Sequence, residues 1–195
     1  MTNNQFNELQ HIVKSRRTTG WAKMNGKTIP DEVVEKLIHL ADWAPNHGKT
    51  EPWFFFIYRG EGLSTFSKAH AELYLQNTAE DKRNDATYER LLHCTDKVSH
   101  LVIAVMKRGI NPKIPQFEEV AAASAGVQNI LLGATAMGIA SFWSTGGMTL
   151  QPALKNYLQL AEEDLVLGML FLGYTDEPLK EGVRTIPMSE KTKWL

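Results

Sequence analysis

The sequence lacks the features of a secreted or membrane-spanning protein. Cys94 is the only cysteine, so no disulfide can form within the chain and a reducing compartment is expected. Met1–Gln10 is polar and has no apolar core of the kind found in signal peptides. The longest apolar run, Leu165–Tyr174, is far too short to cross a bilayer. We therefore expect a cytoplasmic protein with no membrane partner.

An excess of one charge is also missing. Lys and Arg number 21 and Asp and Glu number 22, which gives a formal net charge of -1 at pH 7. Such a balance gives no general attraction for polyanions, so we expect no nucleic-acid partner. His and Cys do not occur at the spacing of a structural metal site, and we expect no metal. The sequence also has no Walker-type glycine loop and no G-x-S-x-G elbow, which disfavours P-loop and serine-hydrolase chemistry.

Helical and strand patterns alternate along the chain without a regular βαβ repeat. Apolar spacing predicts helices over 4–16, from about 28 toward Pro45, within 62–97, over 116–138 and over 152–157. Strands are predicted over 53–58, 101–106, 140–145 and 165–172. Thr28 is expected to cap the second helix and Pro45 to end it. The pattern predicts an α+β fold in a single domain of residues 1–195, with the apolar helix 116–138 at the centre of the protein or of a dimer.

Arg16-Arg17-Thr18, at the end of the first predicted helix, is the most informative short motif. Two arginines and a hydroxyl are suited to a phosphate monoester, because guanidinium groups donate charged, paired hydrogen bonds. The same arginines could simply complement the dipole at the C-terminus of a helix. The motif alone leaves both interpretations open.

Two irregular stretches could line a planar ligand. In Ala44–Trp53, two prolines and a glycine fix the path of a loop that carries His47 and is flanked by Trp43. In Phe142–Gly147, an aromatic strand end meets two glycines, which permit close approach of a ring or a phosphate. Each could instead be a rigid connector with incidental polar residues. Gly133 and Gly138 are first interpreted as packing and capping positions, because their spacing is not a dinucleotide fingerprint.

Taken together and in order, these stretches resemble the nitroreductase family of FMN enzymes. The resemblance is carried by Arg16-Arg17-Thr18, by DWAPNHGKTEPWFFFI (42–57), by QFEEVAAASAGVQNILLGATAMGIASFWSTGG (116–147) and by LVLGMLFLGY (165–174). It implies an α/β sandwich with a central, mostly antiparallel sheet flanked by helices. It also implies an interlocked homodimer with two FMN sites at the subunit interface.

The resemblance assigns roles to residues along the whole chain. Arg16, Arg17 and Thr18 would bind the flavin phosphate and ribityl region, with Arg184 as a further basic contact. Gly20 stands where the family often has another arginine, so fewer fixed cations surround the phosphate here. Trp43 and His47 would approach FMN from the other protomer, and a flavin-lining stretch consists of Trp143, Ser144 and Thr145. The segment that would meet the nicotinamide nucleotide consists of Gly133, Ala134, Thr135, Ala136, Met137 and Gly138.

The implied activity is hydride transfer from NAD(P)H, through FMN, to an electron-poor acceptor such as a nitroaromatic or a quinone. The cofactor supplies this chemistry, so no catalytic side chain is assigned. Two alternatives remain open. One is a non-catalytic dimeric protein that stores or senses FMN, and the other is a flavin-dependent reductive dehalogenase-like enzyme of the same superfamily.

Overall fold

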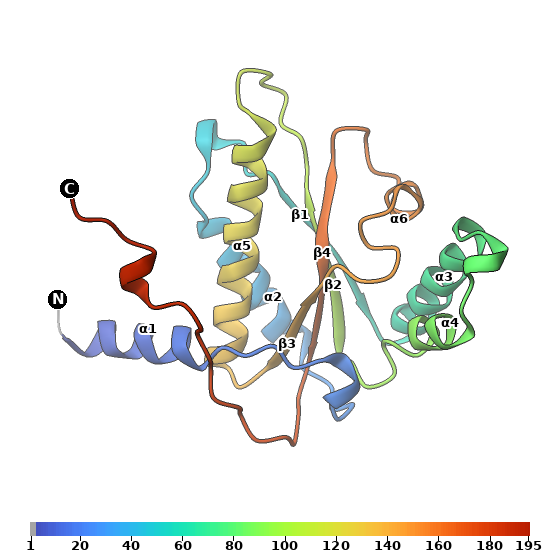
Figure 1. The fold of residues 1–195 in the computed structure, drawn as a ribbon, viewed down its shortest axis with the longest axis horizontal. Coiled ribbons are helices and arrows are strands. Elements are labelled where there is room, and N and C mark those ends of the chain that lie inside the picture. Colours follow the sequence, from blue (N-terminus) through green and yellow to red (C-terminus); the bar gives the residue numbers. More distant parts are fainter. Residues whose placement is uncertain (1–2) are drawn as a thin grey trace.

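The computed structural model describes residues 3–195, and residues 1 and 2 of the expected single domain 1–195 lie outside the described part. Helices cover both faces of one sheet, and the two ends of the chain lie on the same side of the molecule (Figure 1). The helices are α1 (Asn3–Ser15), α2 (Asp31–His39), α3 (Glu61–Asn77), α4 (Asp85–Leu92), α5 (Gln116–Ala136) and α6 (Pro152–Tyr157). The strands are β1 (Trp53–Arg59), β2 (His100–Met106), β3 (Ala140–Ser144) and β4 (Leu165–Gly173).

The four strands form one antiparallel sheet in the order β1-β2-β4-β3. The long strands β2 and β4 occupy its centre, with Val102 opposite Leu170, and the register shifts between Ala104 and Val105. All seven residues of β2 are buried, which explains its continuous apolar sequence. The predicted α+β fold with an antiparallel central sheet is confirmed.

Each face of the sheet has its own apolar core. Alternate residues of the central strands point to opposite faces, because side chains in a strand alternate with a period of two. Val102 and Leu170 pack under α2 and α5, whereas Ile103 and Phe171 pack under α3 and α6. The fold is therefore a three-layer sandwich, and α5 is its most central helix.

Small residues let α5 lie close to the segment that follows α2. A Cβ atom on Gly126 would lie 3.3 Å from the Ala41 side chain, and one on Gly133 would overlap Leu40. The helix ends at Ala136, two residues before the predicted end, and Gly138 has a φ of +69°. Glycine adopts that conformation without strain, so Gly138 ends the helix as a C-terminal cap residue would. Among residues 3–195, no helix has both the length and the hydropathy that crossing a bilayer requires.

The start of α2 differs from the sequence-based prediction. Pro30 occupies the N-cap position without a side-chain hydrogen bond, so the expected cap by Thr28 is wrong. Asp31 instead contributes at this end, accepting a hydrogen bond from Nε2 of buried His100 at 3.0 Å and pairing with Arg59. The helix gives way at His39 to a 3₁₀ turn, Leu40–Trp43, that ends just before Pro45.

Candidate cofactor site

The segment that follows α1 runs along the outer edge of β3. Thr18 pairs with Ser141 in a parallel bridge, and the Thr19 amide donates to the Ser141 carbonyl at 2.9 Å. Because the two segments run parallel, Arg16 lies toward the start of β3 and Gly20 lies toward Trp143, so the pairing joins the Arg16–Thr18 motif to the strand that carries the predicted flavin-lining residues. Two of the predicted stretches, far apart in the sequence, are thus neighbours in the fold.

The two arginines of the motif have different surroundings. Arg17 donates to the carbonyl oxygens of Lys180 at 2.7 Å, of Lys14 at 2.5 Å and of Arg16 at 2.9 Å. A Cβ on Gly182 would lie 2.6 Å from the Arg17 guanidinium, so the C-terminal segment packs directly on it. Within residues 3–195, the half-buried Arg16 side chain makes no hydrogen bond or ion pair. Arg17 therefore holds the C-terminal segment in place, whereas the Arg16 guanidinium keeps its donors unused among the described residues and lines neither of the two cavities at Arg17.

Two cavities meet at Arg17. One, of about 380 Å³, lies between Thr18, Gly20, Lys23 and the segment from Thr175 to Glu181. Its cations are partly compensated, because Lys23 forms a 2.7 Å ion pair with Glu177. The other, of about 330 Å³, extends to His11 on α1 and to the end of α5. Arg184 lies two residues beyond Gly182, is exposed, and donates only to the neighbouring Val183 carbonyl at 2.8 Å among the described residues.

Trp143 is held rigidly at the end of β3. Its indole N–H donates to the Leu167 carbonyl at 3.0 Å, and its ring lies directly on the backbone of Gly168. Gly168 has a φ of +147°, and any Cβ there would overlap the indole. Beyond Trp143, the Ser144 hydroxyl accepts the Gly146 amide at 3.2 Å, and Thr145 is exposed. The strand end thus offers a fixed aromatic ring followed by an accessible turn.

The predicted nucleotide-facing segment at the end of α5 divides into buried and accessible residues. Ala134 is fully buried, and Gly133 packs against Leu37 and Leu40. The outer residues Ala136, Met137 and Gly138 are exposed, and Thr135 and Gly138 line the second cavity beside Arg17. Only this outer part of the segment can meet a ligand without rearrangement of the core.

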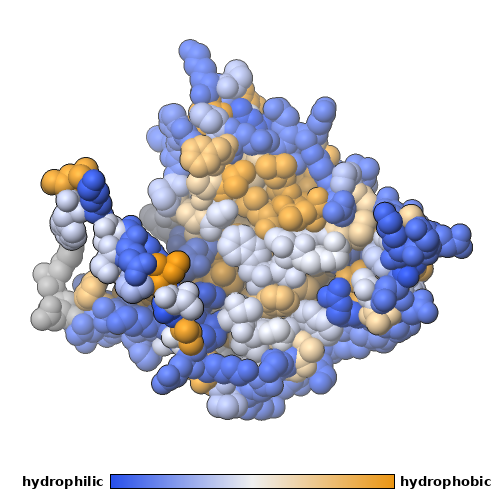
Figure 2. Space-filling view, in the orientation of Figure 1, coloured by the Kyte–Doolittle hydropathy of each residue, from blue (hydrophilic) through white to orange (hydrophobic). Residues whose placement is uncertain are grey.

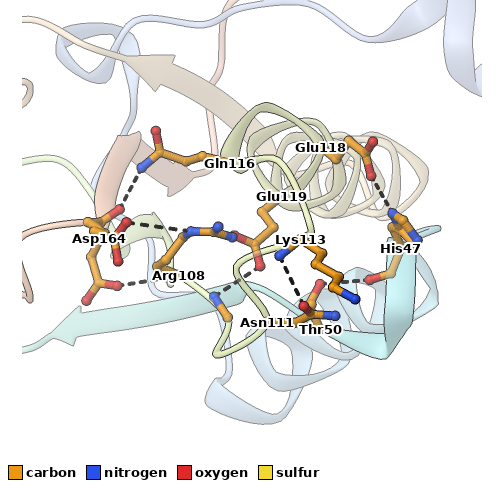
Figure 3. Close-up of polar contacts among 11 residues, drawn as sticks. His47, Thr50, Arg108, Asn111, Lys113, Gln116, Glu118, Glu119 and Asp164 are labelled. Carbon is orange, nitrogen blue, oxygen red and sulfur yellow. Dashed lines mark hydrogen bonds and ion pairs between the residues drawn. The ribbon is translucent and has the colours of Figure 1, made fainter.

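Trp43 and His47 lie elsewhere, against the first half of α5, and neither lines the cavities at Arg17. His47 binds Glu118 through Nδ1 at 2.6 Å (Figure 3). Trp43 is 85% exposed, whereas nearby Trp53 donates its indole N–H to Asp42 at 2.9 Å. Within one chain, the structure therefore does not bring this pair together with Arg16–Thr18 or Trp143.

A polar cluster at the start of α5 fixes the connection between β2 and α5 (Figure 3). Glu119, 1% exposed, accepts from the Arg108 guanidinium at 2.5 Å and from the Gly109 amide at 3.0 Å. Buried Asp164 accepts the Arg108 amide at 2.9 Å and the Ala161 amide at 3.1 Å. Both acids have all their carboxylate oxygens engaged, so their role is structural.

Reactive groups outside these stretches are scarce. Burial raises the pKa of the Cys94 thiol to about 12, which leaves it protonated and unreactive at neutral pH. In the part of the chain that the structure describes, no three His, Cys, Asp or Glu side chains cluster closely enough to hold a metal ion.

Apolar surface extends around the site. Figure 2 shows a mainly apolar area over the region of α5 and β4, above a band of intermediate hydropathy. On α1, Phe6, Leu9 and Val13 form one exposed stripe, with exposures of 65%, 54% and 48%. Exposed apolar residues continue in the C-terminal segment at Leu179, Val183, Ile186, Met188 and Trp194. Groups of exposed apolar side chains are a common feature of surfaces that contact a partner.

Two supporting residues were missed by sequence reasoning. Gly168 interrupts an apolar strand, and a glycine in that position indicates close approach of another group, so its signal was present. Gly182, which lets the C-terminal segment rest on Arg17, lies in a stretch without periodicity. No sequence pattern marks the long-range contact that Gly182 makes.

The chain was compared with known families and structures. The sequence profile of the Nitroreductase family matches residues 13–174. YdjA of Escherichia coli (strain K12), provisionally named an NAD(P)H nitroreductase, is 26% identical over 142 residues, 73% of this chain and 75% of YdjA.

Solved structures agree with that match. A nitroreductase-like family protein from Bacillus cereus superposes with a TM-score of 0.78 at 27% identity, covering 96% of this chain and 95% of the other. A nitroreductase from Bacteroides fragilis with bound FMN gives 0.72 at 23% identity, covering 97% and 100%. The profile match spans all four strands of the sheet and every stretch of the candidate site except Arg184. The chain belongs to the nitroreductase family.

Proposed function

We propose that this protein is an FMN-dependent NAD(P)H oxidoreductase that works as a homodimer and reduces an electron-poor acceptor such as a nitroaromatic or a quinone. The observation that carries the proposal is the pairing of Thr18 with Ser141, which joins the segment of Arg16, unpaired among the described residues, and of the exposed Thr18 hydroxyl to the strand that holds the rigid Trp143 ring. The FMN bound to the Bacteroides fragilis relative supports the same cofactor here. The provisional name of YdjA supports NAD(P)H as the reductant.

The residues at the β3 edge fit the FMN phosphate and ribityl chain. Arg16 has guanidinium donors that no described residue occupies, and the Thr18 hydroxyl is exposed next to it. A Cβ on Gly20 would meet no atom within 4 Å, so there is open space beside Thr18. Charge-assisted bonds from arginine are the strong contacts that a phosphate needs. Arg184 would add a cation if the C-terminal segment folds toward the phosphate.

When bound, FMN would supply two-electron transfer between the nicotinamide and the acceptor. The chain's own contribution is placement and access. Trp143 and Ser144 would border the ring, and the exposed Thr145 would lie at its edge. The outer residues at the end of α5, Thr135 to Gly138, would border the entrance for the nicotinamide nucleotide. No side chain is required to transfer a proton in the first hydride step.

Dimerisation would complete the site. Trp43 and His47 are remote from Arg17 in one chain, so we propose that they reach the FMN bound by the other subunit. The apolar stripe Phe6, Leu9 and Val13 and the exposed C-terminal segment would form the contact. Residues 1–195 would then act as one unit of a two-site assembly.

The visible spectrum of the purified protein with added FMN, before and after anaerobic NADPH or NADH, tests the proposal. We expect bound flavin bands that bleach on addition of the nicotinamide, followed by recovery of the bands with a quinone or nitro acceptor. Bands that persist would favour a flavin-storing or flavin-sensing protein. A protein that binds no flavin would contradict the proposal.

Arg16, unpaired within residues 3–195, provides a sharper test. Arg16→Ala should raise the dissociation constant for FMN by about tenfold to a hundredfold, because a charged hydrogen bond contributes about 1.5–3 kcal/mol. Lys68→Ala removes an exposed cation on α3 and serves as the matched control. FMN fluorescence quenching measures both constants. Equal affinities in Arg16→Ala and the control would remove Arg16 from the site.

A further inference from the structure

His70 lies in the middle of α3 and is completely buried. Its Nε2 atom accepts a hydrogen bond from the backbone amide of Met148 at 2.9 Å. Met148 belongs to the turn that follows β3 and comes three positions after Thr145, which with Ser144 would line the flavin. His70 therefore joins a helix on one face of the sheet to the turn of the candidate site.

The hydrogen bond fixes the chemical state of the imidazole. A ring nitrogen that accepts an amide proton cannot itself carry a proton, so the ring is neutral with its hydrogen on Nδ1. Nδ1 has no hydrogen-bond partner among residues 3–195, although it is buried. An unpaired buried donor carries a free-energy penalty that an apolar side chain in the same place would avoid. The hydrogen bond from the Met148 amide to Nε2 offsets this penalty.

The turn rests directly on the ring. Gly147 has a φ of +63°, and a Cβ there would lie 2.8 Å from the imidazole Cε1 and 2.7 Å from Leu91. On the other side of the turn, the Gly146 carbonyl accepts the Thr149 hydroxyl at 2.5 Å and Ser144 accepts the Gly146 amide. The backbone from Ser144 to Met148 is thus held by His70 and by hydrogen bonds with the Ser144 and Thr149 side chains.

We propose that His70 is a positioning residue that holds the Ser144–Met148 turn in the geometry required to receive the flavin ring. This inference rests on the proposed function. His70 itself lies beneath the turn, so it acts through the Met148 amide rather than by touching the cofactor. Its contribution is to keep the exposed backbone at Thr145–Gly147 in one conformation before the ligand arrives.

Two polar substitutions separate this role from simple packing. In His70→Gln, the side-chain oxygen can reach the position of Nε2 and accept the Met148 amide. In His70→Asn, the shorter side chain places its oxygen near the position of Nδ1 and cannot reach that amide. Both variants bury an amide of similar polarity in the same place, so the comparison isolates the acceptor.

The experiment measures FMN affinity by fluorescence quenching and exchange of the Met148 amide proton by NMR. We expect His70→Asn to speed Met148 exchange and to weaken FMN binding, each by about tenfold or more, and His70→Gln to stay within about threefold of the wild type. Wild-type behaviour of His70→Asn in both measurements would overturn the proposal. Equal loss in the two variants would also overturn it.

Failure of the proposed FMN-dependent function can be distinguished from failure of the role proposed for His70. If wild-type protein binds no FMN, the proposed function falls, and Met148 exchange alone then reports whether His70 holds the turn. If wild-type protein binds FMN and His70→Asn binds it equally well, the function stands and the positioning role is wrong. The two proposals are therefore separated by the wild-type titration.

Discussion

The candidate site has two halves that are held in different ways. The strand-edge half, Arg16–Thr18 with Trp143–Met148, is fixed by backbone pairing to β3, by the fit of Trp143 on Gly168 and by buried His70. The loop half, Trp43–Glu51, is fixed at the surface by polar contacts such as His47 to Glu118. The first half is anchored in the core of one chain, whereas the second presents an almost bare Trp43 to solvent.

The loop half also carries backbone strain that the strand-edge half avoids. Lys49 and Glu51 have φ values of +54° and +43°, a conformation that non-glycine residues rarely adopt. In the strand-edge half and in the strand β4 that supports Trp143, the positive φ values fall on glycines, Gly147 and Gly168. Strained residues persist only where their surroundings hold them, and they cluster at functional sites. The difference marks the loop as the half in which strain is concentrated, which agrees with the functional role proposed for it.

The largest effect should come from breaking the core support of the strand-edge half. Gly168→Ala should lower the free energy of unfolding by about 3 kcal/mol, because the methyl group overlaps the Trp143 indole and the φ of +147° disfavours alanine. Gly62→Ala is the matched control, since its methyl group would meet only Tyr58, at 3.8 Å. Urea unfolding measures both. Similar stability of the two variants would show that the indole can move away.

A charge on the apolar stripe should weaken the proposed dimer and so remove the loop half from the flavin site of the other subunit. Leu9→Asp should weaken dimerisation by about 100-fold, because it places a carboxylate in the proposed apolar contact. Asn7→Asp adds the same charge to α1 away from the stripe and should leave the dimer intact. Sedimentation velocity over a dilution series measures the association. A flavin-loaded monomer in Leu9→Asp would contradict the shared site.

Lowering the pH should reduce the free energy of unfolding, because His70 beneath the strand-edge half is protonated more easily in the unfolded chain. Burial, and secondarily the charge of Arg90, lowers the pKa of His70 to about 4, below the value of about 6.5 in the unfolded chain. Between these values the unfolded state binds a proton that the folded state excludes, so stability falls as the pH drops below about 6.5. At pH 5 the loss should reach about 2 kcal/mol, and above pH 7 it should vanish.

His70→Gln should remove this part of the pH dependence while leaving other titrating groups in place. His100 also has a lowered pKa, caused by burial and by Arg59, and acts in the same direction in both proteins. The measurement is the difference between wild-type and variant unfolding free energies at pH 5 and pH 7. A difference that does not change with pH would show that His70 takes up a proton in the folded state without penalty.

The smallest effect should come from the polar contact that holds the loop half. His47 and Glu118 are 62% and 38% exposed, so solvent screens their attraction. A double-mutant cycle with His47→Ala and Glu118→Ala should give a coupling energy below about 1 kcal/mol. Thermal or urea unfolding of the four proteins supplies the cycle. A coupling of several kcal/mol would make the loop half as firmly held as the strand-edge half.

The sequence predicted much of the fold because apolar periodicity reports burial. The continuous run in β2 and the alternation between helix and strand patterns led to the right elements, with α5 ending only two residues early. The cap of α2 could not be found in this way. Pro30 and the contacts of Asp31 to His100 and Arg59 depend on long-range geometry rather than on a local motif.

The candidate site was predictable as a set of stretches but not as an arrangement. The motif left phosphate binding and helix capping open for Arg16 and Arg17 alike, and only the contacts of Arg17 with the Lys180, Lys14 and Arg16 carbonyls distinguish the two arginines. His70 carried no sequence signal, because a lone histidine in a helix has the same pattern whether it supports a turn or faces solvent. Such assignments need the positions of distant backbone groups.

The fit of Trp143 on Gly168 restricts how this protein can evolve. Any larger residue at 168 displaces the indole, whereas a smaller residue at 143 leaves an unfilled hollow over the strand. A single substitution at either position therefore passes through a damaged intermediate, and an altered ring-binding surface requires both to change together. Adaptation to new acceptors should consequently begin at Thr145 or in the loop that carries Trp43, where each step can be taken alone.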